Sequence, residues 1–316
     1  MKIAILGAGA VGGTFGARLH EAGEDVTLVA RGQTYERLRS RGLVFDDLGT
    51  KKTLDIPTVG SVAELENPDC IVIATKALDP AHTFDNLPPN VPIVLTQNSV
   101  ESPYIAADAV GEQWVVPGVV RGFMHYLGPA TIAFTPGPLS LNVGALEGTN
   151  EQSRQAARDL VAALNRSGVG GDFLDDILVD VWMKAMFVAT FGALGSAANA
   201  PLDVLHGRLR PTFEAMMDDV YRTGVAMGVP LAEDAVAQTL AFSDKMPSGS
   251  TTSMQRDFLR GDTCELSAQL PAVIRLADSK GVRVDASRAI CALLELELDR
   301  RDGVEPRFSV PARDGE

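Results

Sequence analysis

The sequence predicts an α/β, doubly wound N-terminal domain followed by an all-α C-terminal domain. Two observations lead to this prediction. Short apolar runs typical of buried strands alternate with helix-like segments through the first half of the chain, which indicates a parallel sheet covered by helices. Strand-like runs then stop after about residue 172, and the remaining segments show helical periodicity. We therefore place the boundary in the segment 170–174 and predict domains of residues 1–172 and 173–316.

The elements of the first domain follow one another as strand, helix and strand. The predicted strands are 2–7, 25–31, 70–76 and 92–98, with further strands between 114 and 143. The predicted helices are 11–22, 33–41 and 151–168, and segments 42–45 and 51–57 are expected to form a hairpin. The second domain is expected to contain helical segments 175–199, 203–227, 231–246, 250–279 and 286–301, with a loose tail after Arg301.

The charge and the cysteines exclude several classes of function. The 316 residues carry a formal net charge of −13, whereas nucleic-acid binders and peripheral proteins of anionic membranes need a basic surface. A small anionic ligand remains compatible, because a local pocket can be positive on an acidic protein. The three cysteines lie far apart without metal-ligand spacing, so we expect no metal site and a reducing, cytoplasmic setting. The charge-free window 185–202 is too rich in small and polar residues for a good membrane span.

A glycine-rich turn, GAGAVG, directly follows the first predicted strand and opens the first predicted helix. In this context the pattern is typical of a Rossmann-type dinucleotide-binding domain. Gly7 permits the tight turn, Gly9 lets the backbone approach a pyrophosphate, and Gly12 allows the helix to pack closely on the strand. Ala10 and Val11 complete the predicted cofactor-binding turn, because N–H groups at a helix N-terminus attract an anion. The alternative is a glycine-rich turn without a ligand.

The end of the second predicted strand favours NADP as the cofactor. NAD sites place Asp or Glu there to hold the ribose 2′-hydroxyl, whereas this strand ends with Arg31 and no carboxylate. Arg31 can pair with a 2′-phosphate; alternatively, it is a solvated loop residue and the protein is indifferent to the cofactor. Lys76 and Asn98 also follow predicted strands, at the edge where open α/β sheets bind ligands. Both are candidates to contact cofactor or substrate, although either could equally be an ordinary loop residue.

Motifs in both halves of the chain form one pattern. They are GAGAVG (7–12) with Arg31, ATK (74–76), Asn98, DVWMK (180–184) and TTSMQRDFLRGDTCEL (251–266). This pattern resembles the ketopantoate reductase (2-dehydropantoate 2-reductase) family over almost the whole chain, up to about residue 300. The glycine turn alone is generic, whereas the W-x-K helix together with S-M-x-x-D and T-x-E is much more specific.

The resemblance implies an NADPH-dependent oxidoreductase that reduces a 2-oxo acid, with ketopantoate as the first candidate and pantothenate biosynthesis as the pathway. It implies that Lys184 is the general acid and that Glu265 is essential, either by supporting the lysine or by binding substrate. It also implies that Ser253 and Asn98 bind substrate and cofactor. These residue types suit the chemistry, because hydride transfer to a carbonyl carbon develops charge on the oxygen, which a nearby cation stabilises and protonates.

The chain departs from the family at three substrate-side positions. Family asparagines usually lie four and eight residues after the lysine, where this chain has Val188 and Gly192. Another usually follows the glutamate by five residues, where this chain has Leu270. We assign Val188 and Gly192 to the substrate site together with Lys184. Losing the amides should relax selectivity for the hydroxylated ketopantoate and enlarge the pocket at Gly192, so a more apolar or bulkier carbonyl substrate stays an alternative.

Two other functions stay open. A 3-hydroxyacid dehydrogenase of the 6-phosphogluconate type shares the two-domain plan and a catalytic lysine, but the S-M-x-x-D and T-x-E motifs argue against it. A catalytically idle NADP-binding redox sensor is supported by the missing asparagines and opposed by the presence of Lys184 and Glu265. Taken singly, Lys184 could be a snorkelling lysine and Glu265 a solvated charge. The sequence identifies no dimer interface, and a homodimer stays open.

Overall fold

The computed structural model describes residues 1–79 and 82–305, and the packing divides the chain into two compact units. Unit 1 is Met1–Lys184 and unit 2 is Ala185–Glu316. The division falls inside one long helix, later than the sequence-based boundary between residues 172 and 173. The start of this helix belongs to unit 1 because Leu178 packs against a hydrophobic cluster of that unit. Most of the tail after Arg301, predicted to be loose, lies outside the described residues.

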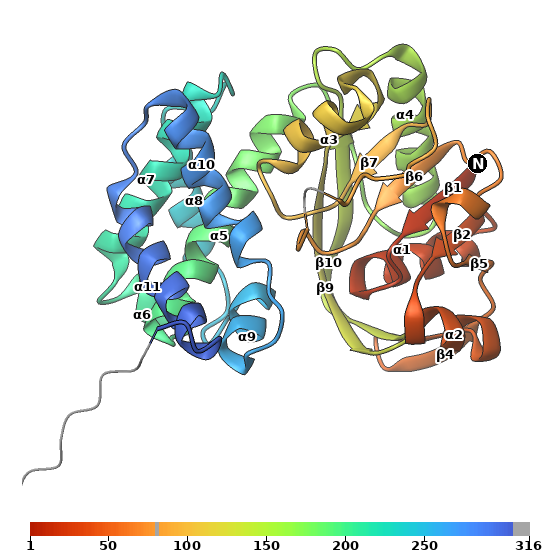
Figure 1. The fold of residues 1–316 in the computed structure, drawn as a ribbon, viewed down its shortest axis with the longest axis horizontal. Helices are drawn as coiled ribbons and strands as arrows, with labels where there is room; N and C mark the ends of the chain where they lie inside the picture. Colours follow the sequence, from red (N-terminus) through yellow and green to blue (C-terminus); the bar gives the residue numbers. More distant parts are fainter. Residues whose placement is uncertain (80–81, 306–316) are drawn as a thin grey trace, which may run out of the picture. The chain divides into compact units, whose positions relative to one another are not determined.

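Unit 1 is built on a six-stranded parallel sheet (Figure 1). Its strand order is β5-β2-β1-β6-β7-β8, and every neighbouring pair is parallel. The strands are β1 (Lys2–Leu6), β2 (Asp25–Val29), β5 (Thr58–Val59), β6 (Cys70–Ile73), β7 (Ile93–Leu95) and β8 (Val115–Val116). Counted in chain order, this is the 3-2-1-4-5-6 arrangement of Rossmann-type dinucleotide-binding domains. The predicted doubly wound α/β domain is therefore confirmed.

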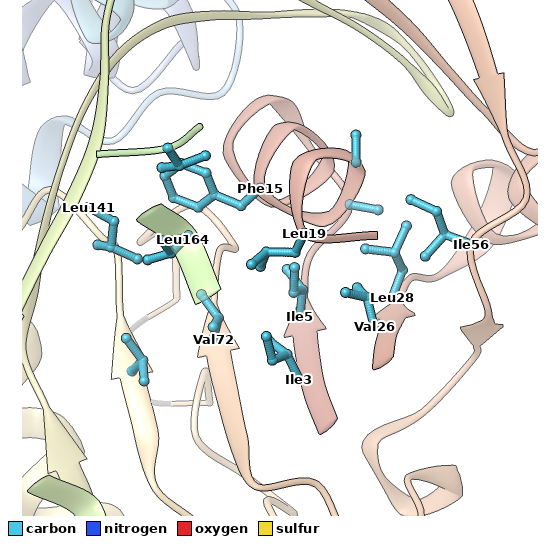
Figure 2. Close-up of a cluster of buried hydrophobic side chains, with 14 of the residues drawn as sticks. Ile3, Ile5, Phe15, Leu19, Val26, Leu28, Ile56, Val72, Leu141 and Leu164 are labelled. Carbon is cyan, nitrogen blue, oxygen red and sulfur yellow. The ribbon is translucent and has the colours of Figure 1, made fainter. Parts of the chain in front are cut away.

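Alternating side chains of this sheet enter two hydrophobic clusters. Ile3 and Ile5 of β1 join one cluster, and Ala4 between them joins the other. The alternation follows from strand geometry, which points successive side chains to opposite faces. Figure 2 shows the first cluster, where Ile5 lies beside Leu19 of the helix that follows β1, and Ile3 and Phe15 belong to the same cluster. Because both faces are covered, these strands are continuous apolar runs in the sequence.

Four helices of unit 1 lie between its strands, ahead of the long helix in which the unit ends. They are α1 (Ala10–Glu21), α2 (Gly32–Arg41), α3 (Ser102–Val110) and α4 (Glu151–Arg166), with short 3-10 turns at Val62–Glu64 and Glu112–Trp114. Helices α1, α2 and α4 agree with the predicted segments. Helix α3 was not predicted, although Pro103 lies in its first turn, where proline is favoured. Its Ala106 is fully buried in the second cluster, so tertiary packing stabilises this short helix.

A second sheet of unit 1 is formed around a long antiparallel hairpin, β9 (Gly118–Gly128) and β10 (Thr131–Gly144). Its order is β11-β10-β3-β4, with β9 paired to β10. Strands β3 (Leu43–Asp47) and β4 (Thr50–Leu54) form the predicted hairpin, and β11 is Phe173–Leu174. Residues Thr131–Phe134 of β10 run parallel to β3, which ties the long hairpin to the rest of the unit. The sequence predicts several short strands here, because Pro136 and Gly137 interrupt the apolar pattern. In the structure β10 continues through these residues with a shift in register.

Every regular element in the described part of unit 2 is a helix (Figure 1), which confirms the all-α prediction. The helices are the end of α5 (Ile177–Ala198), α6 (Leu202–His206), α7 (Arg210–Ala226), α8 (Ala235–Ser243), α9 (Ser253–Arg260), a 3-10 turn at Leu266–Ala268, α10 (Leu270–Lys280) and α11 (Asp285–Arg301). Two predicted segments are each divided. Segment 203–227 breaks before α7, where Pro211 lies in the first turn. Segment 250–279 breaks after α9 at Gly261, whose φ of +77° ends a helix in the left-handed conformation.

Helix α5 is the long apolar helix that contains the W-x-K motif. By length and composition this helix could cross a membrane, but one such helix is only weak evidence of a membrane span. In its apolar window 61% of the residues are buried inside the protein, as is typical of a core helix. Trp182 and Met186 are both fully buried.

Candidate active site

The three glycines of the turn between β1 and α1 have different environments. Gly7 has a φ of +107°, and a Cβ there would lie 2.8 Å from the Thr75 backbone nitrogen, so only glycine fits. A Cβ on Gly12 would lie 1.9 Å from the Gly7 carbonyl oxygen, because α1 passes directly against the turn. A Cβ on Gly9 would meet nothing within 4 Å. The turn therefore combines a tight bend, close helix packing and an open approach, as a pyrophosphate site requires.

The N-terminus of α1 adds hydrogen-bond donors to this turn. Gly9 is the N-cap residue, and the first turn contains Ala10, Val11 and Gly12. The first N–H groups of a helix have no partner within the helix, and together with the helix dipole they attract anions. The first turn contains no acidic residue, and the N-cap provides no side-chain hydrogen bond. This end of α1 is therefore suited to a phosphate group.

A pocket of about 170 Å³ opens beside the glycine turn. It is lined by Leu6, Gly7, Ala8, Gly9, Val29, Ala30, Arg31, Thr34, Thr75 and Tyr126. Arg31 is exposed and is the N-cap residue of α2, and Thr34 lies in the first turn of the same helix. A guanidinium group, a hydroxyl group and a helix N-terminus are the donors that recognise a phosphate. Because the lining residues that the structure describes include no carboxylate, the pocket fits a 2′-phosphorylated dinucleotide better than NAD.

Two further predicted residues follow the neighbouring strands β6 and β7. Lys76 lies three residues after β6, and Asn98 lies three residues after β7. Gln97 Nε2 donates a hydrogen bond to the Thr75 carbonyl oxygen at 3.3 Å, which ties the two strand ends together. Thr75 lines the pocket, whereas Lys76 is exposed and is not among the lining residues. The structure thus brings Gly7, Gly9 and Arg31 together, but leaves Lys76 outside this group.

Lys184 is held at the carboxyl end of the parallel sheet. Its Nζ donates hydrogen bonds to Asn98 Oδ1 at 2.5 Å and to the Val120 carbonyl oxygen at 2.6 Å. Asn98 follows β7, and Val120 lies in β9. A snorkelling lysine does not describe this side chain, because its ammonium group points to acceptors of the protein. The structure therefore brings together two residues, Lys184 and Asn98, that the sequence places 86 positions apart.

Asp180, one helical turn before Lys184, anchors α5 to the long hairpin. Arg121 Nη1 and Asn142 Nδ2 each donate a hydrogen bond to Asp180 Oδ2 at 3.0 Å. Burial raises the pKa of Asp180, but hydrogen bonds from Arg121 and Asn142 and the charge of Arg121 bring the pKa below its ordinary value of 3.8. Asp180 is therefore ionised at neutral pH, and its negative charge lies one turn from the Lys184 ammonium group.

Ser253 and Glu265, the other residues implied by the motifs, lie in unit 2. Ser253 is the exposed first residue of α9, whose N-cap Thr252 accepts a hydrogen bond from the Gln255 backbone N–H at 3.0 Å. Glu265 is partly buried and directly precedes the 3-10 turn. Since Lys184 belongs to unit 1, the structure places the predicted residues in two groups, one in each unit.

The space at Gly192 is filled by neighbouring side chains. A Cβ on Gly192 would lie 2.8 Å from Met254 Cε, 3.1 Å from Thr252 Oγ1 and 3.6 Å from Gln269 Oε1. The expectation that Gly192 enlarges the pocket is therefore wrong, because α9 and the residue before α10 occupy that space. Val188, one turn earlier on α5, is only partly buried.

An amide group does lie close to Gly192, and it comes from Gln269. The side chain is 3% exposed, and neither Oε1 nor Nε2 has a hydrogen-bond partner among the described residues. Buried amide groups without a protein partner are uncommon. The next residue, Leu270, occupies the family's asparagine position and is fully buried. A comparison with the family at position 270 alone shows a lost amide and overlooks the amide of the preceding residue, Gln269.

Sequence reasoning also missed the three polar or aromatic side chains that line the pocket besides Arg31. Thr34 and Thr75 lie close in the sequence to Arg31 and Lys76, so their neighbours could have indicated them. Tyr126 comes from the distant hairpin β9–β10, and no sequence signal marks it as a pocket residue. Val120 contacts Lys184 through its backbone carbonyl oxygen, which any residue type would provide.

Two of the three cysteines, Cys70 and Cys291, are buried. Burial raises the pKa of Cys70 and of Cys291 to about 12, so neither forms a reactive thiolate near neutral pH. Among residues 1–79 and 82–305, no group of three His, Cys, Asp or Glu side chains is arranged to hold a metal ion.

Comparisons with known proteins find similarity along most of the chain. The family model described as "Ketopantoate reductase PanE/ApbA" matches residues 3–148, and the model "Ketopantoate reductase PanE/ApbA C terminal" matches residues 176–297. The 2-dehydropantoate 2-reductase of Mesorhizobium japonicum is 26% identical, with 94% of this chain and 98% of the relative covered.

Solved structures show the same likeness. The crystal structure of 2-dehydropantoate 2-reductase from Methylococcus capsulatus is 28% identical with a TM-score of 0.84, and 95% of this chain and 97% of that chain are covered. D-mandelate dehydrogenase, solved with NADH and anilino(oxo)acetate, also has a TM-score of 0.84, with 96% of this chain and 100% of that chain covered. At 20% identity, the second likeness concerns the fold alone.

Proposed function

Because this chain belongs to the ketopantoate reductase PanE/ApbA family, we propose that it uses NADPH to reduce a 2-oxo acid to a 2-hydroxy acid, with Lys184 as the general acid. Members of this family are NADP-dependent oxidoreductases that act on CH–OH groups. The observation that carries the proposal is the pair of hydrogen bonds from Lys184 Nζ to Asn98 and to the Val120 carbonyl oxygen. They hold a cation at the carboxyl end of the sheet that bears the glycine turn, where open α/β sheets bind their ligands.

The residues of unit 1 provide the parts of a cofactor site. When bound, NADPH supplies the hydride, so the task of the protein is to bind and orient. Gly7, Gly9 and the N-terminus of α1 would hold the pyrophosphate, and Arg31 would hold the 2′-phosphate. Lys76, which follows β6, stays a proposed cofactor contact at the same edge of the sheet.

Lys184 would act on the oxygen of the keto group. As hydride reaches the carbonyl carbon, negative charge grows on this oxygen, and an ammonium group within hydrogen-bond distance stabilises the charge and gives a proton. Asn98 and the Val120 carbonyl group are neutral acceptors, so they orient the ammonium group without neutralising its charge. Asn98 would also contact the substrate or the cofactor, as the family resemblance implies.

Unit 2 would contribute the remaining substrate contacts. We assign Glu265 to supporting Lys184 or binding substrate, and Ser253, Val188 and Gly192 to the substrate side. In the same proposal, residues 1–172 form the NADP-binding domain and residues 173–316 the helical substrate domain. We place the protein in the cytoplasm, with the 2-oxo acid as its small-molecule partner. Light scattering would test whether it forms a homodimer.

Ketopantoate is the first candidate substrate, because the curated relative from Mesorhizobium japonicum and the solved relative from Methylococcus capsulatus are both named 2-dehydropantoate 2-reductase. The alternative is a more apolar carbonyl compound. It is supported by the apolar Val188 and Leu270, which stand where the family usually has asparagine. D-mandelate dehydrogenase, solved with anilino(oxo)acetate, shows only that a protein of similar fold can hold a compound with an aromatic ring.

The test is a substrate comparison with purified protein, NADPH and NADH. The decisive pair is ketopantoate and 3,3-dimethyl-2-oxobutanoate, which differ by one hydroxyl group, with phenylglyoxylate as an aromatic 2-oxo acid. A site that hydrogen-bonds the hydroxyl should prefer ketopantoate by roughly 10⁴-fold in kcat/KM, whereas relaxed recognition should bring the pair within about 10²-fold. NADPH binding without turnover of any of these acids, or of a wider 2-oxo acid panel, would refute the reductase and favour the redox sensor.

A further inference from the structure

The hairpin β9–β10 brings an aromatic side chain to the pocket beside the glycine turn. Among the lining residues, Tyr126 alone comes from this hairpin, while the others belong to β1, β2, α2 and the turns that follow β1, β2 and β6. Tyr126 is 53% exposed. Apart from Arg31, the other lining residues are small or aliphatic. A large, exposed aromatic ring thus borders the pocket, and the other described lining residues carry no aromatic ring.

The strand geometry directs Tyr126 toward the core side of the hairpin. Met124, two residues earlier on β9, packs against the hydrophobic cluster that contains Phe15 of α1. Alternate residues of a strand share one face. Tyr126 therefore continues the face that Met124 buries, beyond the end of the core and beside the glycine turn.

A β-bulge sets this direction. Tyr126 pairs with Ile132 of β10, whereas an unbroken ladder would pair Leu127 with Ile132. Directly opposed residues of an antiparallel pair point to the same face, so the extra residue Leu127 turns Tyr126 to the side of Ile132. Ile132 is fully buried, and its Cδ1 would lie 2.9 Å from a Cβ on Gly13 of α1. The position of Tyr126 is therefore tied to the start of α1.

We propose that Tyr126 is a further cofactor-binding residue, whose ring packs on the adenosine half of NADPH and forms the outer wall of the pocket. This inference rests on the proposed use of NADPH. The glycine turn, the α1 N-terminus and Arg31 offer donors for phosphate groups, but they offer no flat apolar surface for the base and ribose. An aromatic ring provides that surface, since every base has a π-face on which it can stack. Tyr126 and Arg31 thus act on different parts of the same half of the cofactor.

The experiment measures binding of adenosine 2′,5′-bisphosphate to the full chain by isothermal titration calorimetry. This ligand contains the adenosine and both phosphates near it, but no nicotinamide, so the readout does not depend on turnover. Tyr126→Ala should weaken binding by about 5- to 150-fold, the range that removal of a stacking aromatic side chain spans. Tyr126→Phe, which keeps the ring, should stay within about threefold of the unmodified protein.

Leu127→Ala is the matched control, because Leu127 is the adjacent residue and is 59% exposed. It should leave the affinity within about twofold, and the thermal midpoints of both alanine variants should stay within about 3 °C of the unmodified protein. Unchanged binding in Tyr126→Ala, or an equal loss in Leu127→Ala, would overturn this inference while leaving the proposed function intact. If the unmodified protein neither binds the bisphosphate nor reduces 2-oxo acids with NADPH, both are overturned.

Discussion

Replacing Lys184 by methionine should abolish most of the reductase activity while leaving the protein folded. Methionine keeps an unbranched stem and a high helix propensity in α5, but it removes the ammonium group. General acid catalysis contributes about 10²- to 10⁴-fold to a rate, so we expect kcat to fall by that factor. This corresponds to a rise of about 2.7–5.4 kcal/mol in the activation free energy.

The same substitution has a limited cost in stability. The substitution removes the hydrogen-bond donor of two acceptors, Asn98 Oδ1 and the Val120 carbonyl oxygen. The Asn98 side chain is partly buried and can turn to water, whereas Val120 is only 6% exposed. One buried acceptor left without a partner costs about 1–3 kcal/mol. Domains are typically stable by about 5–15 kcal/mol, so the variant should remain folded and its loss of rate should be interpretable.

The assay follows NADPH oxidation at saturating 2-oxo acid and is paired with NADPH binding measured by cofactor fluorescence. For Lys184→Met, kcat should fall while the affinity for NADPH stays within about threefold, because the residue acts on the substrate oxygen. Lys245→Met, which removes an exposed lysine of unit 2, is the control and should change neither quantity. A Lys184→Met protein that keeps more than about a tenth of the turnover would contradict the assignment of Lys184 as general acid.

Three further predictions concern the cofactor, pH and stability. Arg31→Ala should raise the KM for NADPH by roughly 10- to 150-fold and leave the KM for NADH unchanged, because the substitution removes charge-assisted hydrogen bonds to the 2′-phosphate alone. Steady-state kinetics that show equal changes in KM for both cofactors would contradict this role of Arg31. The stabilisation from Asp180, whose folded-state pKa lies below 3.8, is present above that value and lost as pH falls through the lower pKa. In urea titrations Asp180→Asn should therefore lower the free energy of unfolding by about 1–3 kcal/mol at pH 7, with the difference shrinking below about pH 4; a constant difference would argue against the ionised carboxylate. Asp219 is 3% exposed and accepts a hydrogen bond at 2.9 Å from the Ser287 backbone N–H at the start of α11. Asp219→Ala should therefore lower the free energy of unfolding by about 1–3 kcal/mol, whereas Asp218→Ala, at an exposed neighbour, should change it by no more than about 0.5 kcal/mol. Equal losses in the two variants would show that the buried contact is not the cause.

Local patterns predicted the elements that bury side chains in a regular way. Strand β1 is an apolar run because both of its faces are covered, and the glycines after it mark the turn into α1. Helix α3 was missed because it is short and relies on tertiary contacts, such as the burial of Ala106. The hairpin β9–β10 was divided into separate strands because Pro136 and Gly137 interrupt the sequence pattern, although the strand continues through a change of register there. Nonlocal pairing of this kind has no local signature.

In the candidate site, too, sequence motifs identify some of the side chains, but they cannot identify backbone groups or the neighbours that fill a space. Lys184 follows from its motif, but its partner Val120 acts through a backbone carbonyl oxygen. Gly192 illustrates the larger difficulty, because a glycine is easily read as empty space, whereas its neighbours here are Met254 Cε and the buried amide of Gln269. Losing the family asparagine at this position therefore adds little volume. Any change in substrate selectivity should come instead from the loss of polarity at the partly buried Val188, which is apolar where the family side chain is an amide.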